Sequence, residues 1–157
     1  MRAANLLSIK NYKDINVIVL DSNFILLPYQ FKIDYLNDIY LNLEGRIRFF
    51  IFKQSLNELE AKIRREPKTR KLKRQFKAGM SYLDKNEKVY PLYFIDEIKT
   101  EEETTDEFLL KWCIQFKKEY KKVFLATNDS ELRKKAKNSK VNVIFLRQKK
   151  YLVIERS

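Results

Sequence analysis

The sequence contains no histidine, only one cysteine and only two glycines in 157 residues. The missing histidine excludes Ser-His-Asp triads, histidine-based acid–base catalysis and His-ligated zinc. Because Cys113 is the only cysteine, an internal disulfide and a CxxC metal site are excluded, and we expect a reducing compartment, the cytoplasm. Gly45 and Gly79 are too far apart for a glycine-rich phosphate loop. An enzyme of this composition relies on carboxylates, lysines, hydroxyls or metal ions.

Long hydrophobic runs are also missing. No apolar run reaches the length of a membrane-spanning helix, so we expect no membrane partner. Residues 1–16 lack the apolar segment of a signal peptide, and we assign them to an N-terminal extension, followed by a single domain over residues 17–157. The 33 Lys and Arg residues exceed the 21 Asp and Glu residues, giving a net charge of +12. This surplus favours an anionic partner, nucleic acid before an acidic membrane surface.

Short apolar runs alternate with apolar residues at helical spacing. The runs predict buried strands at residues 17–20, 47–53, 89–95, 122–127 and 141–146, with an edge strand at 151–154. The helical patterns fall at residues 35–43, 56–63, 67–83, 108–116 and 130–137. Strands that alternate with helices in this way predict an α/β fold, with a parallel sheet covered on both faces.

Acidic residues follow four of the predicted strands. Asp21 follows the first strand directly, and Glu58 is expected in the first turn of the helix after the second. Asp106 opens the helix after the third strand, and Asp129 follows the fourth. Because sites in open parallel sheets form beyond the carboxyl ends of the strands, all four acids are expected at one edge.

Each acid also has a purely structural interpretation. Ser55-x-x-Glu58 and Thr104-x-x-Glu107 have the capping-box pattern, Asp129 can cap the next helix, and Asp21 can start a turn. Taken together, the four acids favour a different interpretation. A like-charged pair at ~4 Å and an effective dielectric near 20 costs about 4 kcal/mol, and a divalent cation removes that cost. Hard oxygen ligands suit Mg²⁺ or Mn²⁺.

At these acids the sequence resembles the PIN-domain nuclease family. The resemblance is carried by four motifs: Val19-Leu-Asp21-Ser-Asn23-Phe, Ser55-Leu-Asn-Glu58-Leu, Thr105-Asp106-Glu107-Phe and Ala126-Thr-Asn-Asp129-Ser-Glu-Leu132. It implies a three-layer α/β/α fold whose mostly parallel sheet has the strand order 3-2-1-4-5. It also implies metal-dependent hydrolysis of RNA phosphodiester bonds, with Asp21, Glu58, Asp106 and Asp129 as catalytic metal ligands. Asn23, Thr127 and Asn128 are implied as supporting polar groups.

Two further segments, Leu26–Phe31 and Val143–Leu152, are similar to an archaeal branch related to the small-subunit rRNA-processing PIN nucleases. VapC-type toxin nucleases are the nearer competing branch. The resemblance therefore implies an rRNA precursor as the substrate, with a toxin ribonuclease or a non-cleaving RNA- or ribonucleoprotein-binding module as alternatives. A homodimer, and a ribosome-assembly or antitoxin partner, are compatible with it.

A strongly basic segment, residues 62–77, carries nine basic residues against one acid, Glu66. A solvated helix face ordinarily explains a charge run, but like charges four residues apart destabilise a helix. We therefore favour a phosphate-contacting segment over plain solvation. Its basic residues are Lys62, Arg64, Arg65, Lys68, Arg70, Lys71, Lys73, Arg74 and Lys77. A second, acidic stretch at residues 96–107 is expected to be a solvated loop.

Overall fold

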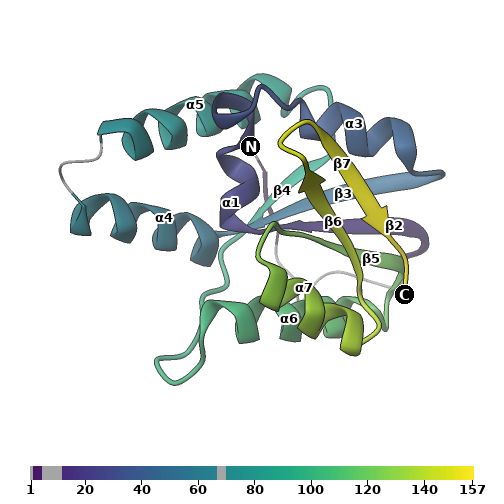
Figure 1. Ribbon diagram of the computed structural model, residues 1–157. Coiled ribbons are helices and arrows are strands. Elements are labelled where there is room, and N and C mark those ends of the chain that lie inside the picture. The colour runs from purple at the N-terminus through teal and green to yellow at the C-terminus, as the bar shows by residue number, and fades with distance from the viewer. Residues whose placement is uncertain (1, 5–11, 67–69) are drawn as a thin grey trace.

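The computed structural model describes residues 2–4, 12–66 and 70–157, and its centre is a seven-stranded sheet (Figure 1). The strand order is β1-β4-β3-β2-β5-β6-β7, and only the β6–β7 pair is antiparallel. The five predicted core strands are β2 to β6, and they confirm the order 3-2-1-4-5. The predicted edge strand is β7. The strands are β1 (Arg2–Ala4), β2 (Tyr12–Leu20), β3 (Arg46–Phe52), β4 (Leu92–Ile95), β5 (Tyr120–Ala126), β6 (Asn142–Arg147) and β7 (Tyr151–Glu155).

Two strand boundaries differ from the sequence expectation by three residues or more. The sheet reaches back into the segment assigned to the N-terminal extension, because β2 begins at Tyr12 and β1 pairs with β4. Residues 1 and 5–11 of that segment lie outside the described residues, and the domain boundary at residue 17 stays a prediction. The other difference is that β4 begins at Leu92 and not at Val89. Pro91 has no N–H for the ladder, and the Leu92 N–H turns back to the Tyr90 carbonyl, at 2.9 Å.

Helices of very different lengths connect the strands. Those described are α1 (Ser22–Ile25), α2 (Leu27–Gln30), α3 (Tyr35–Asn42), α4 (Lys53–Arg65), α5 (Arg70–Asn86), α6 (Thr105–Phe116) and α7 (Ser130–Asn138). The predicted start of α5 near Pro67 lies outside the described residues. Helices α1 and α2 were not predicted, because four residues each are too few to show a periodic apolar pattern. In the ranges 12–66 and 70–157, no helix is long and apolar enough to cross a membrane.

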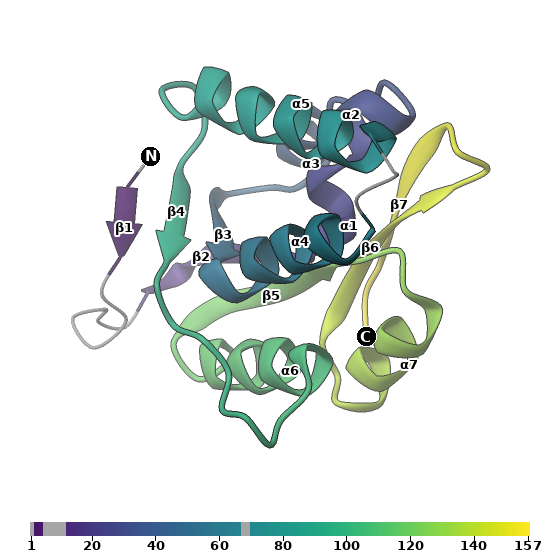
Figure 2. The same cartoon turned by 90° about the vertical axis from the view of Figure 1, so that its left-hand side faces the viewer.

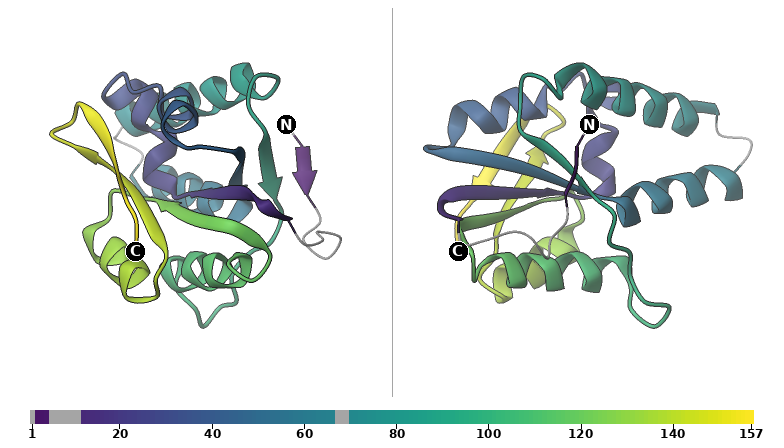
Figure 3. Two further views of the ribbon diagram at one scale, coloured as in Figure 1. Left: turned by 90° about the vertical axis from the view of Figure 1, so that its right-hand side faces the viewer. Right: turned by 180° about the vertical axis from the view of Figure 1, so that it is seen from behind.

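Apolar side chains fill a core on each face of the sheet. Along β2, Ile18 and Leu20 point to one face and Val17 and Val19 to the other, as the period of two requires. The first core lies under α1, α2, α3 and α5, and the second lies under α6 and α7. Figure 3 shows the sheet between these two helical layers. The three-layer α/β/α prediction is thus confirmed.

The parallel strands end at the edge from which α1, α4 and α7 begin (Figure 2). Helix α5 is held unusually close to this edge through Gly79, which packs on α1. A Cβ atom at position 79 would lie 2.0 Å from the Ile25 carbonyl oxygen. Only glycine therefore fits here, and its contact fixes the short helix that follows Asp21.

Candidate metal and nuclease site

Asp21 ends β2 and is almost fully buried, with 5% of its surface exposed. Its carboxylate caps α1 by accepting the Ser22 N–H at 2.7 Å. The other oxygen accepts the Thr127 hydroxyl at 2.7 Å and the Asn23 side-chain amide at 3.2 Å. Burial raises the pKa of Asp21, and the charges of Asp106 and Asp129 raise it further. Within the described part of the chain, no ion pair includes this carboxylate, so neutral donors alone hold it.

A polar network joins the ends of β2, β5 and β6. The fully buried Thr127 hydroxyl donates to Asp21 and accepts the Asp129 N–H at 3.1 Å. The Asn23 side-chain oxygen accepts the Asn128 N–H at 3.1 Å, and the Asn128 side chain accepts the N–H of Leu146 at 2.8 Å. The three residues predicted to support the site therefore connect the two predicted acids of neighbouring strands.

Asp129 is the N-cap of α7, as its structural interpretation required. One carboxylate oxygen accepts the N–H groups of Glu131 and Leu132, at 2.9 and 3.1 Å. The side chain is exposed, and both of these hydrogen bonds go to the same oxygen, so the second oxygen takes no part in the cap. Capping a helix and binding a cation are therefore compatible roles for this residue.

Glu58 is an exposed residue of α4, but its predicted position in the first turn was wrong. Helix α4 continues directly from β3 and begins at Lys53, which places Glu58 in the second turn. The capping box expected at Ser55 is also absent, because Ser55 already lies inside the helix and is fully buried. Partial desolvation raises the pKa of Glu58, and the charge of Asp21 adds to it.

Asp106 is a half-buried residue in the first turn of α6. The capping box before it is confirmed: the Thr104 hydroxyl accepts the Glu107 N–H at 3.1 Å, and the Glu107 carboxylate accepts the Thr104 N–H at 3.3 Å. Asp106 itself takes no part in the cap. Burial raises its pKa, and the charge of Asp129 adds to this.

The four acids share one electrostatic environment. Asp21 is affected by the charges of Asp106 and Asp129, Glu58 by those of Asp21 and Asp106, and Asp106 by that of Asp129. In the described ranges, however, no three acidic or cysteine side chains lie close enough together to hold a metal ion. The chemistry of the donors fits a hard cation such as Mg²⁺ or Mn²⁺, since all four are carboxylates. The buried thiol of Cys113 does not fit as a donor, because burial raises its pKa far above neutrality.

Sequence reasoning missed Gln54, which lies one helical turn before Glu58 on α4. Its side-chain oxygen accepts the Lys99 N–H at 3.2 Å, and its amide donates to the Thr105 hydroxyl at 3.5 Å. Gln54 thereby connects α4 with the acidic loop and with the start of α6, beside Asp106. Its spacing of four residues from Glu58 was the available sequence signal.

The basic arm, residues 62–77, spans the end of α4 and the start of α5, which project beyond the sheet (Figure 1). The apolar stripe Leu72, Phe76 and Met80 packs on the first core, which leaves the basic side chains outside. Lys68 lies outside the described residues. The other eight are exposed: Lys62, Arg64, Arg65, Arg70, Lys71, Lys73, Arg74 and Lys77.

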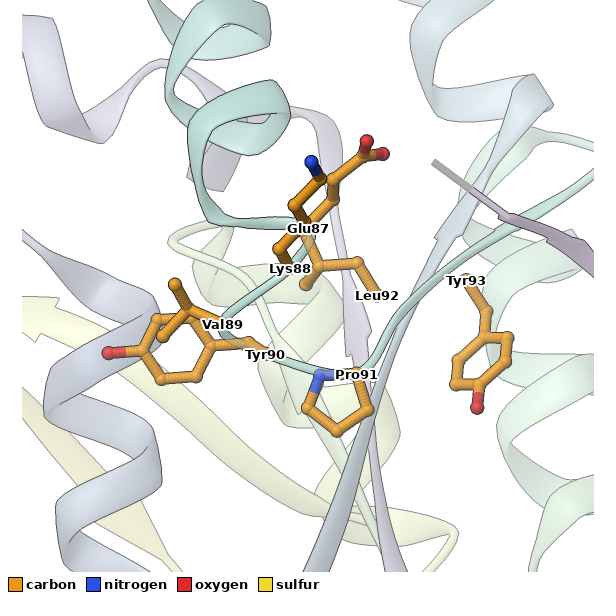
Figure 4. A pocket seen from close by; sticks show the side chains of 7 residues that line it. All are labelled: Glu87, Lys88, Val89, Tyr90, Pro91, Leu92 and Tyr93. Atoms are coloured by element: carbon orange, nitrogen blue, oxygen red, sulfur yellow. The ribbon is translucent and has the colours of Figure 1, made fainter.

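None of the pockets described for residues 12–66 and 70–157 is lined by the four acids. A pocket of about 530 Å³ does lie at the α5–β4 connection, lined by Glu87, Lys88, Val89, Tyr90, Pro91, Leu92 and Tyr93 (Figure 4). It is at the amino end of β4, whereas the acids gather at the carboxyl ends of the strands. We therefore place the chemistry at the acids and not at this pocket.

Comparisons with known proteins bear on the family and the fold. A family model described as a PIN like domain matches residues 18–149. The protein named Ribonuclease VapC4 from Methanocaldococcus jannaschii is 30% identical over 137 residues, covering 87% of this chain and 95% of that protein. The solved structure of the PIN domain endonuclease Utp24 has a TM-score of 0.63 at 19% identity, covering 90% of this chain and 92% of that one. At this identity, the structural likeness concerns the fold.

Proposed function

Because the chain belongs to the PIN-like domain family, we propose that it is a metal-dependent endoribonuclease that hydrolyses RNA phosphodiester bonds in rRNA processing. The observation that carries the proposal is the set of four mutually repelling carboxylates at one sheet edge, beside an exposed basic arm. The similarity to a protein named as a ribonuclease supports RNA as the substrate. A cytoplasmic location is part of the same proposal.

In the proposed mechanism, Asp21, Glu58, Asp106 and Asp129 hold Mg²⁺ or Mn²⁺. The bound cation would supply Lewis acidity, lowering the pKa of a water molecule and neutralising the charge that develops on the phosphate. Ser22, Asn23 and Thr127 fix the orientation of Asp21 through neutral hydrogen bonds, leaving its negative charge uncompensated. The basic arm holds the phosphates of the bound RNA.

The proposal is tested by incubating the protein with pre-rRNA, tRNA and generic single-stranded RNA, in Mn²⁺ or in chelator. We expect Mn²⁺-dependent cleavage, with pre-rRNA cut at a defined position. A preparation of Asp21→Asn purified in parallel controls for contaminating nuclease. Cleavage that persists undiminished in chelator, or equally in Asp21→Asn, overturns the proposal.

The identity with the VapC4 ribonuclease favours a second candidate, a toxin ribonuclease. The same assay separates the two: a toxin of this kind would cut tRNA or generic RNA at least as well as pre-rRNA, and an antitoxin would abolish the cleavage. A protein that binds RNA tightly in Mn²⁺ without cutting any of the three substrates would instead be a non-cleaving PIN module.

A further inference from the structure

Two arginines lie over the ring of Phe145, at the carboxyl end of β6. The guanidinium carbon of Arg133 is 4.1 Å from the ring centroid, and that of Arg147 is 5.3 Å from it. Phe145 and Arg147 are two residues apart on β6 and therefore share one face of the sheet. Helix α7 covers this face and contributes Arg133. Both guanidinium groups therefore lie against the same aromatic ring.

The positive charge of this pair is not neutralised locally. Among residues 12–66 and 70–157, the ion pairs include neither arginine. The nearby carboxylate is Glu155, which pairs with Lys137 at 2.8 Å. Lys137 is the main cause of the lowered pKa of Glu155, and Arg147 and Arg133 contribute less. One carboxylate therefore faces three cations, which leaves a surplus of positive charge.

This cation pair is tied to the candidate site by the backbone. The Arg133 N–H donates to the Asp129 carbonyl at 3.0 Å, one helical turn away. The Asn128 side chain accepts the N–H of Leu146, the residue between Phe145 and Arg147. The pair thus borders the acids on the β6 side, whereas the basic arm leaves the sheet from β3 and returns to β4. Figure 2 shows α5 on one side of the sheet and α6 and α7 on the other; the apolar stripe of the arm packs on the first core, whereas Phe145 belongs to the second.

We propose that Arg133 and Arg147, held by Phe145, form a second phosphate-binding site for single-stranded RNA, across the acids from the basic arm. The inference rests on the proposed function, because it assumes an RNA substrate that crosses the edge of the sheet. Guanidinium groups offer planar forks of donors that match phosphate oxygens, and they stack on aromatic rings. Stacking on Phe145 orders both forks before RNA binds, which reduces the entropy lost on binding.

The test measures binding of fluorescein-labelled oligouridine in chelator, so that no cleavage occurs. Arg133→Gln/Arg147→Gln should bind at least about tenfold more weakly than wild type. The slope of log affinity against log salt should fall by about 1.4, since each phosphate bound on a single strand contributes about 0.7. Lys121→Gln/Lys122→Gln removes the same charge at the amino end of β5, where both lysines are exposed, and should bind almost as wild type does.

Arg133→Lys/Arg147→Lys separates the geometry from the charge. It should keep most of the salt slope but still bind RNA more weakly, because lysine lacks the planar fork and stacks poorly on Phe145. Melting curves of all variants check that they are folded.

In one outcome, Arg133→Gln/Arg147→Gln binds RNA as tightly as the control Lys121→Gln/Lys122→Gln does, while wild type cuts RNA. In that case the arginines only cover the ring, and this inference fails while the proposed function stands. Wild type that neither binds nor cuts RNA overturns the proposed function as well.

Discussion

Replacing Asp21 with asparagine should abolish cleavage while making the metal-free protein more stable. The variant keeps the size of the side chain and its oxygen can still accept the Ser22 N–H that caps α1. It removes a buried negative charge whose environment contains Glu58, Asp106 and Asp129. It also removes a hard ligand that the proposed cation needs.

The expected magnitude is the difference between two opposing effects. The Asn23 amide and the Thr127 hydroxyl both lose their acceptor in the variant, because an amide nitrogen replaces the second carboxylate oxygen; two such hydrogen bonds contribute about 2 kcal/mol. In the other direction, a like charge about twice as far away as an ion-pair partner repels by about 2 kcal/mol at an effective dielectric near 20; Asp21 is repelled by two, Asp106 and Asp129, and desolvation adds to this. We expect a net gain of about 1–2 kcal/mol, which raises the Tm of a domain of this size by about 3–6 °C.

Thermal melts with and without Mn²⁺, together with one cleavage assay, test this reasoning. At a Mn²⁺ concentration about a hundred times Kd, binding stabilises wild type by about 2.7 kcal/mol, and the variant should gain much less. Asp14→Asn is the matched control, since Asp14 is an exposed carboxylate paired with Arg46 at 3.0 Å, far from the site. The control should cut RNA normally and respond fully to Mn²⁺. An Asp21→Asn protein that melts like metal-free wild type and cuts RNA at the wild-type rate would show that Asp21 only starts a turn.

Four further outcomes follow from the same structure. Gly79→Ala should lower the free energy of unfolding by about 1–3 kcal/mol, because its Cβ would collide with the Ile25 carbonyl. This loss should outweigh the higher helix propensity of alanine, about 1 kcal/mol. The control Ser81→Ala, on the exposed side of α5, should not lower the Tm. Thr127→Val should reduce kcat in saturating Mn²⁺ by about 10- to 100-fold, because it removes the hydroxyl that joins Asp21 to the Asp129 N–H, while Thr127→Ser should keep most activity. Burial and like charges raise the folded-state pKa values of Asp21, Glu58 and Asp106, so the metal-free protein should gain stability as the pH falls from 7 towards their unfolded-state pKa values near about 4. In Mn²⁺ this trend should reverse, and equal slopes of Tm against pH with and without Mn²⁺ would contradict the prediction. The last variant replaces four basic residues of the arm by glutamine: Arg70, Lys71, Lys73 and Arg74. The slope of log affinity for RNA against log salt should fall by about 0.7 for each phosphate that the arm no longer binds, and an unchanged slope would mean that the arm is only a solvated face.

The sheet could be predicted from the sequence because its central strands are buried on both faces. Such strands are continuous apolar runs, as in Val17 to Leu20, and they stand out in a chain that is otherwise rich in charge. Once the order of the strands is given, the residues that follow them must meet at one edge. The placement of Asp21 and Asp129 depends on this topology alone, and the hydrogen bonds through Thr127 agree with it.

Features that depend on interactions between residues distant in sequence could not be predicted. The Thr127 hydroxyl reaches Asp21 across 106 residues, and no local pattern specifies which oxygen it meets. The capping box at Ser55 failed for a related reason: β3 passes into α4 without a loop, so burial against the core determines where the helix begins. The stacking of Arg133 on Phe145 likewise requires that α7 lie over β6.

The neutrality of the donors around Asp21 has a physical consequence for the site. A lysine or arginine beside this carboxylate would relieve the repulsion among the acids, but it would also occupy the position that a cation needs. Ser22, Asn23 and Thr127 orient Asp21 without supplying positive charge, so the repulsion stays available to drive cation binding. Basic side chains lie instead on the arm and over Phe145, where, in the proposed function, they would bind phosphates on both sides of the acids without neutralising them. In the proposed nuclease, this separation of charges would allow a chain with a net charge of +12 to keep an acidic cation site next to an RNA-binding surface.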